Sequence, residues 1–172
     1  MLSHEEQIVK TLTERFEGLT VSIQREKRIW LESPREGFIG LLDYLDKELG
    51  FSSLCTITGL DNGDVFQLIY HLSHNNGIVV NARVSAPAEN PVFDTATDIF
   101  KGAVLYELEA RNLLGLTIIG LPEDIIYPLP DNWPAGQYPL RKSWVLPKKV
   151  DEATDAAAAD ADAAAEEMSD HG

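Results

Sequence analysis

The amino-terminal segment has the hydrophobic pattern of an amphipathic helix. Its apolar residues recur at every fourth position, which places them along one helical face. Ser3 and Glu6 stand just before this stripe and are three residues apart. This is the spacing of a capping box, in which each side chain bonds the other residue's backbone N–H. Gly18 stands where a left-handed residue would end the helix. We therefore predict a helix over residues 4–17, with an apolar stripe made of Ile8, Leu12 and Phe16.

A second helix is predicted to start after Ser33. Ser33 is a suitable N-cap, Pro34 at the first helical position loses no hydrogen bond, and Glu36 completes the capping-box spacing. Gly50 follows the last apolar position and is expected to end the helix. The apolar face of this helix consists of Phe38, Leu41, Leu42, Leu45 and Leu49.

Strands are predicted where apolar and polar residues alternate with a period of two. Residues 74–77 read as a hairpin turn, because Asn and Gly accept positive φ at low cost. The strands predicted at residues 54–58, 65–72 and 78–84, which are joined by a loop and by this turn, should form an antiparallel meander. The predicted strands span residues 21–24, 29–31, 54–58, 65–72, 78–84 and 116–119.

A third helix is predicted between a cap at Asp94 or Thr95 and an end at Gly115. Together these elements predict an α+β fold, in which an antiparallel or mixed sheet of about four strands packs with two or three helices. This α+β domain is assigned to residues 1–121. The inner face of the third helix is expected to consist of Ile99, Ala103, Tyr106, Ala110 and Leu113.

Residues 122–150 are predicted to form an extended proline-rich arm. Six of the nine prolines lie between residues 122 and 147, which excludes a long helix or a central strand. The segment nevertheless carries more apolar area than a flexible linker would, and burying one large side chain is worth roughly 1.5–3 kcal/mol. The arm should therefore lie on a surface, either of this domain or of another protein. Its apolar residues are Ile125, Ile126, Tyr127, Leu129, Trp133, Tyr138, Leu140, Trp144 and Val145.

The charge of the chain is concentrated at its carboxyl end. The 28 acidic and 14 basic residues give a net charge of −14. Residues 151–172 hold eight of the acids and no Lys or Arg, so residues 1–150 carry 20 acids against 14 bases, or −6. Nine alanines among the same 22 residues cannot build a core, and we predict a disordered acidic Ala/Asp/Glu tail. The charge balance argues against nucleic-acid binding, which requires a basic surface.

Cysteine content and hydropathy indicate a reducing compartment. The single cysteine, Cys55, excludes an intramolecular disulfide and a metal site built on several thiolates of this chain. Because it alternates into an apolar strand, we expect a buried structural thiol. The amino terminus has no signal-peptide pattern, and the longest apolar run, residues 113–121, is too short to span a bilayer. We expect any membrane association to come through a partner.

Candidate catalytic and metal-binding residues are few. His71 and His74 are three residues apart, but at a strand end and a turn they should diverge, as ordinary polar hairpin residues. Glu107 and Glu109 are two apart on a helix and cannot face each other as an acid–base pair. At least one of these acids is expected to be partly buried and hydrogen-bonded, and Arg111 stands at ion-pair spacing from Glu107. The sequence has no phosphate-binding loop, dinucleotide fingerprint or nucleophile elbow.

The arm contains the segment Asp131-Asn132-Trp133-Pro134-Ala135-Gly136-Gln137-Tyr138-Pro139-Leu140-Arg141-Lys142. This segment resembles the closing motif of the thirty-kilodalton-subunit family of respiratory complex I, the NADH dehydrogenase. The closing motif of that family consists, in chain order, of Asp-Trp, a Gly and Pro-Leu-Arg-Lys. An upstream helix carries Glu-Arg-Glu, an Asp three residues later and a Gly three after that, and here those positions read Glu107-Leu108-Glu109, Asn112 and Gly115. The resemblance covers about residues 35–146.

Several charged positions of the family are lost in this chain. Leu108, Asn112 and Leu121 stand where the family has Arg, Asp and His, Ile125-Ile126 replace an Arg-Arg pair, and Ser143 replaces an Asp. These losses indicate a divergent branch that faces a different partner surface. The short length is similar to that of the homologues in membrane-bound energy-converting [NiFe] hydrogenases.

The resemblance implies an accessory subunit with no catalytic residue, cofactor or metal of its own. It implies a place on the cytoplasmic side of the membrane, against a large hydrogenase-like or forty-nine-kilodalton-like subunit and a small iron–sulfur subunit. Those partners would hold the [NiFe] centre and the iron–sulfur clusters, and only they would contact the membrane. The residues expected to bind partners or support the structure are Glu107, Glu109, Gly115, Trp133, Gly136, Pro139, Leu140, Arg141, Lys142 and Trp144.

Within this set, Trp133, Leu140 and Trp144 are expected to anchor the arm, because aromatic and proline-ordered residues often dominate binding energy. Arg141 and Lys142 are expected to pair with acids of a neighbouring subunit. An intramolecular wrap of the arm over its own domain remains the alternative interpretation.

Other functions remain open at this point. The chain could be the equivalent subunit of a proton-pumping NADH- or deazaflavin-linked dehydrogenase. It could be a stand-alone enzyme with a site built from Glu107, Glu109 and His71. It could also be a free-standing binding module whose acidic tail recruits a basic partner.

Overall fold

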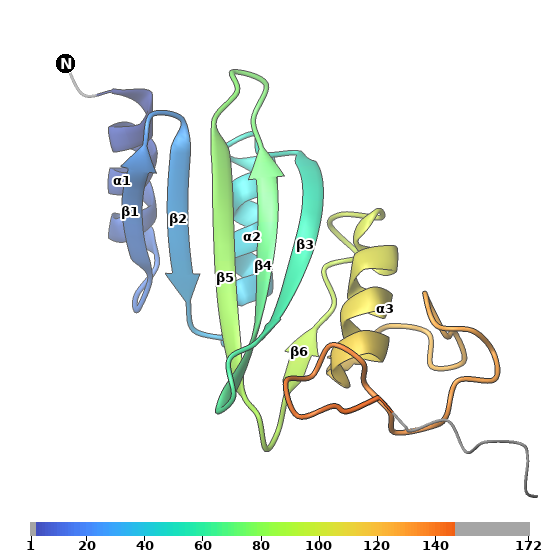
Figure 1. Ribbon diagram of the computed structural model, residues 1–172. Coiled ribbons are helices and arrows are strands. Elements are labelled where there is room, and N and C mark those ends of the chain that lie inside the picture. The colour runs from blue at the N-terminus through green and yellow to red at the C-terminus, as the bar shows by residue number, and fades with distance from the viewer. Residues whose placement is uncertain (1–2, 147–172) are drawn as a thin grey trace, which may run out of the picture.

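The structure is a computed structural model that describes residues 3–146, in which three helices and seven strands are found (Figure 1). The predicted acidic tail lies outside the described residues. The helices are α1 (His4–Arg15), α2 (Phe38–Lys47) and α3 (Ala103–Leu114). The strands are β1 (Thr20–Arg25), β2 (Arg28–Ser33), β3 (Ser53–Asp61), β4 (Val65–Ser73), β5 (Val79–Pro87), β6 (Val92–Asp94) and β7 (Thr117–Ile119).

The five longer strands form one mixed sheet in the order β1-β2-β5-β4-β3. Strands β3, β4 and β5 are antiparallel neighbours, which confirms the predicted meander. Strand β2 pairs with β5 in parallel, so the chain crosses over between them through α2 and the other two strands of the meander. β6 and β7 make a separate parallel pair. The predicted α+β class is confirmed, with one more strand in the main sheet than the sequence indicated.

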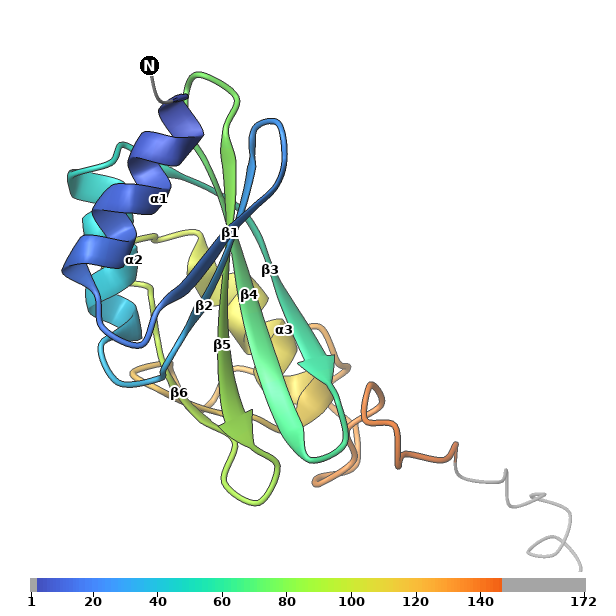
Figure 2. The ribbon, with the colours of Figure 1, turned by 90° about the vertical axis from the view of Figure 1, so that its left-hand side faces the viewer.

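The helices are divided between a face and an edge of the sheet. Figures 1 and 2 show α1 and α2 together on one face. The apolar side chains of these helices meet those of the strands beneath them, and Leu12, Leu42, Leu31, Leu72 and Val80 have no exposed surface. Helix α3 packs instead beside β3, at the edge of the sheet (Figure 1). This edge position brings the end of α3 close to the arm.

The first helix begins as predicted and ends two residues earlier than predicted, at Arg15, with Phe16 rather than a left-handed residue as its C-cap. Ser3 Oγ accepts from the backbone N–H of Glu6, and the Glu6 carboxylate accepts from the Ser3 N–H at 2.6 Å, so the capping box is complete. Within residues 3–146, no helix is both long and apolar enough to cross a membrane.

The second helix begins at Phe38, later than the sequence predicted. Ser33 cannot cap a helix because its backbone pairs with Val84 in the sheet, where it continues β2. The chain leaves the strand through a turn and enters α2 at Gly37, whose φ of 83° is the left-handed conformation that favours glycine. The pairing of β2 with β5, a contact between distant segments, therefore decides where the helix starts.

The third helix also begins later than predicted, at Ala103 rather than after Asp94 or Thr95. Asp94 is the last residue of β6, and the Thr95 N–H donates to the carbonyl of Ile119 at the end of β7. Residues 95–102 form turns in place of the predicted first helical turns. The end of the helix agrees with the prediction, since Gly115 caps it in the left-handed conformation with φ 69°.

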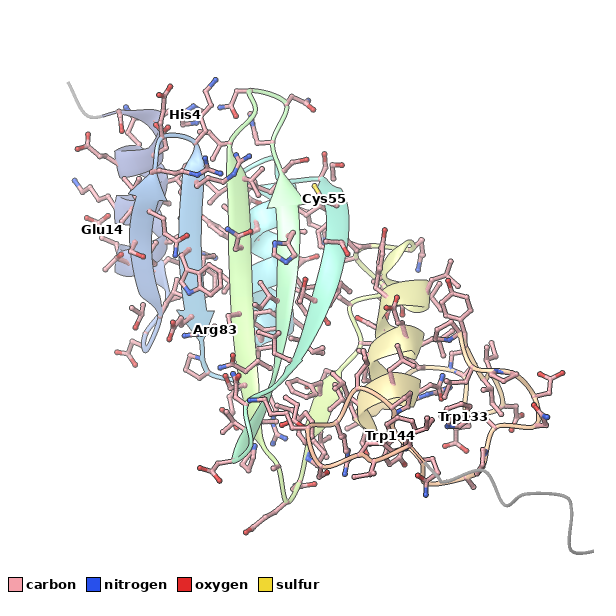
Figure 3. All side chains as sticks on the ribbon, in the orientation of Figure 1. His4, Glu14, Cys55, Arg83, Trp133 and Trp144 are labelled. Carbon is pink, nitrogen blue, oxygen red and sulfur yellow. The ribbon has the colours of Figure 1, made fainter. Side chains whose placement is uncertain are left out.

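Cys55 is exposed, which corrects the prediction of a buried thiol. The register of β3 against β4 shifts between Leu54 and Thr56, so Cys55 occupies a β-bulge. The shift leaves Leu54 and Ile57 packed on the core and turns the thiol outward. Figure 3 shows Cys55 near the start of β3. A bulge breaks the period of two on which the prediction rested.

Candidate functional site: the junction of helix α3 and the arm

Glu107 is a charged residue in the buried stripe of α3. Its neighbours along that stripe are Ala103, Ala110 and Leu114, which face the sheet, and Glu107 itself has no exposed surface. A carboxylate in such a position must be hydrogen-bonded, since burying an unpaired charge costs several kcal/mol. The prediction that at least one of Glu107 and Glu109 is buried and hydrogen-bonded is thus confirmed, for Glu107.

Three donors from two other segments reach the Glu107 carboxylate. The Tyr70 hydroxyl of β4 donates at 3.0 Å, and the backbone N–H of Ala96 donates at 2.8 Å to the same oxygen. The Thr95 hydroxyl donates to the second oxygen. Glu107 therefore ties together α3, the interior strand β4 and the turn that follows β6.

Burial controls the protonation of this cluster. Removal of the Glu107 carboxyl from water raises its pKa, and the donors from Thr95, Ala96 and Tyr70 partly oppose that rise. Burial also raises the pKa of Tyr70 well above its ordinary value, and the nearby Glu107 charge adds to the effect. Tyr70 thus remains a protonated donor at neutral pH.

Glu109 points away from Glu107 and is exposed. It lines a groove between β3 and α3 together with Thr56, Thr58, Tyr106 and Leu140. The structure does not bring His71 to these acids. His71 lies on β4 directly after Tyr70, so its side chain takes the opposite face of the sheet, where it bonds Thr58 at 3.0 Å and Asn81 at 2.7 Å. The three residues of the stand-alone enzyme hypothesis are therefore not assembled into one site.

Arg111 holds the beginning of the arm. Its guanidinium donates to the carbonyls of Pro122 and Ile125, both at 2.6 Å, in place of the ion pair with Glu107 that the spacing suggested. Asn112, which stands where the family has Asp, donates from Nδ2 to the carbonyl of Tyr127 at 3.0 Å. Two side chains of the last turns of α3 thus bind the backbone of residues 122–127.

Arg141 binds the carboxyl end of the same helix. Its Nε donates to the Leu114 carbonyl at 2.6 Å and its Nη2 to the Gly115 carbonyl at 3.1 Å, two acceptors that the helix itself leaves unpaired. The guanidinium also lies over the rings of Tyr138 and Phe66, at 4.6 and 5.2 Å from their centroids. A cation at this place also complements the negative end of the helix dipole.

Gly115 is required where the arm crosses the helix end. Its φ of 69° strains any other residue, and a Cβ built there would lie 2.5 Å from Tyr138 Cε2 and 2.6 Å from Arg141 Nη2. The family glycine at this position therefore has two physical reasons, the helix cap and the close approach of the arm.

Trp133 and Trp144 lie together in the arm (Figure 3). Their ring centroids are 6.3 Å apart, and both indoles donate to Gln137, Trp133 to its backbone carbonyl at 2.8 Å and Trp144 to its side-chain oxygen at 2.9 Å. Gly136 precedes Gln137 with φ 75°, as a tight turn requires. Among the described residues, the arm contains neither helix nor strand, yet these bonds give it a defined shape.

Lys142 contacts the domain through its backbone. Its N–H donates to Asp61 Oδ2 at 2.8 Å, while the side chain is exposed. The N–H groups of Gly63 and Lys142 hold the pKa of Asp61 below its ordinary value. No pattern in the sequence indicated this contact, because Asp61 and Lys142 lie 81 residues apart.

Large apolar side chains of the arm remain in water despite these contacts. Leu140 is 57% exposed, Val145 80% and Leu146 72%. Residues 125–127 are also well exposed. Among the described residues, no group of three His, Cys, Asp or Glu side chains could hold a metal ion. The described contacts of the junction are thus packing and hydrogen bonds between the arm and α3.

A family model described as respiratory-chain NADH dehydrogenase, 30 Kd subunit, matches residues 31–150. Membrane-bound hydrogenase subunit beta of Pyrococcus furiosus is 29% identical over 153 residues, which cover 81% of this chain and 86% of that protein. A subunit of the F(420)H(2) dehydrogenase of Methanosarcina mazei is 28% identical over 142 residues, which cover 80% of this chain and 89% of that protein.

A solved structure shows the same fold. One chain in the structure of the membrane-bound sulfane sulfur reductase, an archaeal respiratory membrane complex, superposes with a TM-score of 0.76. The superposition covers 84% of this chain and 87% of that chain at 23% identity. The relatives named above are thus subunits of multisubunit oxidoreductase complexes.

Proposed function

Because this chain belongs to the family of the respiratory-chain NADH dehydrogenase 30 Kd subunit, we propose that it is a non-catalytic assembly subunit of a membrane-bound energy-converting hydrogenase complex. It would lie on the cytoplasmic side of the membrane and pack against the large subunit and a small iron–sulfur subunit. The partners would hold the [NiFe] centre and the iron–sulfur clusters.

The arm is the feature that supports this role most directly. Arg111 and Asn112 of α3 bind the backbone of the arm, and the Arg141 side chain of the arm binds the end of α3. Leu140 and Val145 nevertheless remain more than half exposed. An exposed apolar surface on a well-ordered support is typical of a protein interface. A fixed arm also loses little conformational entropy when it docks, so more of the contact energy contributes to affinity.

The mechanism proposed for the subunit is positioning. Burial of the arm's apolar residues against the large subunit would hold neighbouring subunits in register. The distances between redox centres in those subunits would then stay short and constant. This role requires no acid, base or ligand from the chain itself.

Two truncations test the proposal in the native complex. A chain that ends after Pro130 lacks Trp133, Leu140 and Trp144, and a chain that ends after Leu146 keeps the whole described arm. We expect the first truncation to abolish co-purification with the large subunit from detergent-solubilised membranes, and the second to leave it unchanged. Wild-type recovery of the complex with the Pro130 truncation would refute the arm as the anchor. Loss of co-purification in both truncations would favour the binding-module alternative, in which the acidic tail recruits the partner, because both truncated chains lack residues 151–172.

A dehydrogenase complex is the second candidate, and the 28% identity to a protein of the F(420)H(2) dehydrogenase favours it. The metal and flavin content of the purified complex distinguishes the two. Nickel in the large subunit supports the hydrogenase, whereas a deazaflavin- or NADH-oxidising subunit without nickel supports the dehydrogenase. Turnover of a substrate by the isolated chain would contradict both.

A further inference from the structure

The Pro139–Lys142 turn places two neighbouring cations in different environments. Arg141 is directed inward, where it binds two carbonyls at the end of α3 and two aromatic rings. Lys142 is exposed, and it contacts Asp61 through its backbone N–H. The sequence suggested a shared role for the pair, as cations for a partner's acids. Their geometry separates them.

We infer that Arg141 is a positioning residue, which locks the arm onto the end of α3 and thereby sets the direction of the apolar side chains around it. This inference rests on the proposed function, since it assigns a role within the docking surface. Leu140 immediately precedes Arg141, and its N–H donates to the Leu113 carbonyl at 3.0 Å. Trp144 follows, and its N–H donates to the Arg141 carbonyl at 3.0 Å. The backbone on both sides is thus tied to the locked residue.

Arginine chemistry fits this role, and lysine chemistry does not. The planar guanidinium offers several donors in fixed directions and stacks on aromatic faces. At Arg141 it uses Nε and Nη2 for two carbonyls while its plane covers Tyr138. A lysine ammonium is a compact, mobile charge that cannot reproduce both contacts. Gly115 leaves the space in which the Arg141 and Tyr138 side chains lie.

Three variants of the full chain test the inference. Arg141→Met removes the donors and keeps an unbranched apolar side chain, and Arg141→Lys keeps the charge alone. Lys142→Met is the matched control, which removes a neighbouring cation without touching the lock. Hydrogen exchange followed by mass spectrometry reports on residues 137–146, and the same measurement on β4 reports on the fold as a whole. Co-purification with the large subunit reports on docking.

The expected results differ between the two cations. Arg141→Met should speed exchange in residues 137–146 on the order of tenfold, because charge-assisted hydrogen bonds are lost, and should leave exchange in β4 unchanged. Arg141→Lys should have an intermediate effect on exchange. Both Arg141 variants should reduce recovery of the complex in the same order, and Lys142→Met should match wild type in both measurements.

Other outcomes would overturn the inference. Equal loss of the complex in Arg141→Met and Lys142→Met, with unchanged exchange, would mean that both cations pair with the partner. Faster exchange in β4 to the same degree as in the arm would make Arg141 a general stability residue. Faster exchange in the arm with full recovery of the complex would show that docking needs no fixed arm. In that case the Pro130 truncation still tests the proposed function separately. Failure of the inference about Arg141 can therefore be distinguished from failure of the proposed function.

Discussion

The buried carboxylate of Glu107 should contribute strongly to stability, and Glu107→Ala tests how much. The substitution leaves the Tyr70 hydroxyl and the Ala96 N–H, both deeply buried, without their acceptor. Each orphaned donor costs about 1–3 kcal/mol, and the side chain leaves a cavity as well. Relief from burying a charge offsets part of this cost. We expect the free energy of unfolding to fall by about 3 kcal/mol, which for a chain of this length lowers Tm by about 6–12 °C.

Two further variants separate geometry from charge. In Glu107→Gln the amide oxygen can accept from Tyr70 and Ala96, and the amide nitrogen can donate to the Thr95 hydroxyl. We therefore expect a loss of about 1 kcal/mol or less. Glu109→Ala, two residues further on the same helix and exposed, is the matched control and should change stability by less than about 0.5 kcal/mol.

Urea unfolding followed by tryptophan fluorescence measures these differences, with Trp30, Trp133 and Trp144 as probes. The slope of the unfolding free energy against urea concentration should be the same for all variants, so that differences between their unfolding midpoints report differences in stability alone. Equal midpoints for Glu107→Ala and Glu109→Ala would refute the argument that Glu107 joins three segments. A Gln variant as unstable as the Ala variant would show that the charge matters and the hydrogen-bond geometry does not.

The pH dependence of Glu107 gives an independent check. Because burial raises its pKa above the ordinary value of 4.5, the folded state binds a proton more tightly than the unfolded chain. The contribution of Glu107 to stability therefore falls as pH rises from about 4.5 through the raised folded value. Glu107→Gln does not titrate, so its stability relative to wild type should increase across that window and stay constant on either side. A flat difference would contradict the raised pKa.

Three further predictions concern the packing of α3, the Asp61 contact and the bulge in β3. Gly59→Ala would place a Cβ 2.7 Å from Leu114 Cδ1 and should lower the free energy of unfolding by about 1–3 kcal/mol. Gly40→Ala in α2, where a Cβ would meet no atom within 4 Å, should raise the free energy of unfolding by about 0.5–1 kcal/mol. Thermal unfolding measures both changes, and changes of the same sign would contradict the packing of Gly59 against α3. Because the folded structure lowers the pKa of Asp61, the stabilisation by this carboxylate is present above its ordinary pKa of 3.8 and is lost as pH falls through its pKa in the folded state. Asp61→Asn should therefore lower the free energy of unfolding in urea by about 1 kcal/mol or less at pH 7, and should not change it in strong acid. The opposite pH trend would refute the contact with Lys142. The Cys55 thiol should react with a maleimide in the native chain at a rate close to that in urea, and protection until unfolding would contradict the bulge.

Local rules predicted the elements whose signals are contained within a few residues. The capping box at Ser3 and Glu6, the meander of β3, β4 and β5, and the cap at Gly115 all depend on side chains that bond or alternate within their own segment. The family membership was also visible in the sequence, because the closing motif that ends in Arg141 and Lys142 is itself a contiguous segment.

The predictions that were wrong depended on contacts between distant segments. Ser33 was assigned to a helix and belongs to a strand, because a parallel pairing with β5 outweighs its capping preference. Thr95 was assigned as a helix cap, and the structure uses it to bind Glu107 and the end of β7. Cys55 was assigned to the core, and a bulge turned it outward.

The sequence alone determined the fold class, the order of most elements and the presence of an apolar, proline-rich arm. It could show that Arg141 and Lys142 are cations, but the direction of each side chain follows from where the arm crosses α3. Only the tertiary structure joins Glu107 to Tyr70, 37 residues away, and Lys142 to Asp61, 81 residues away. The physical reason is that periodicity reports which side of an element is apolar, whereas the partner that a polar group meets depends on how separate elements pack.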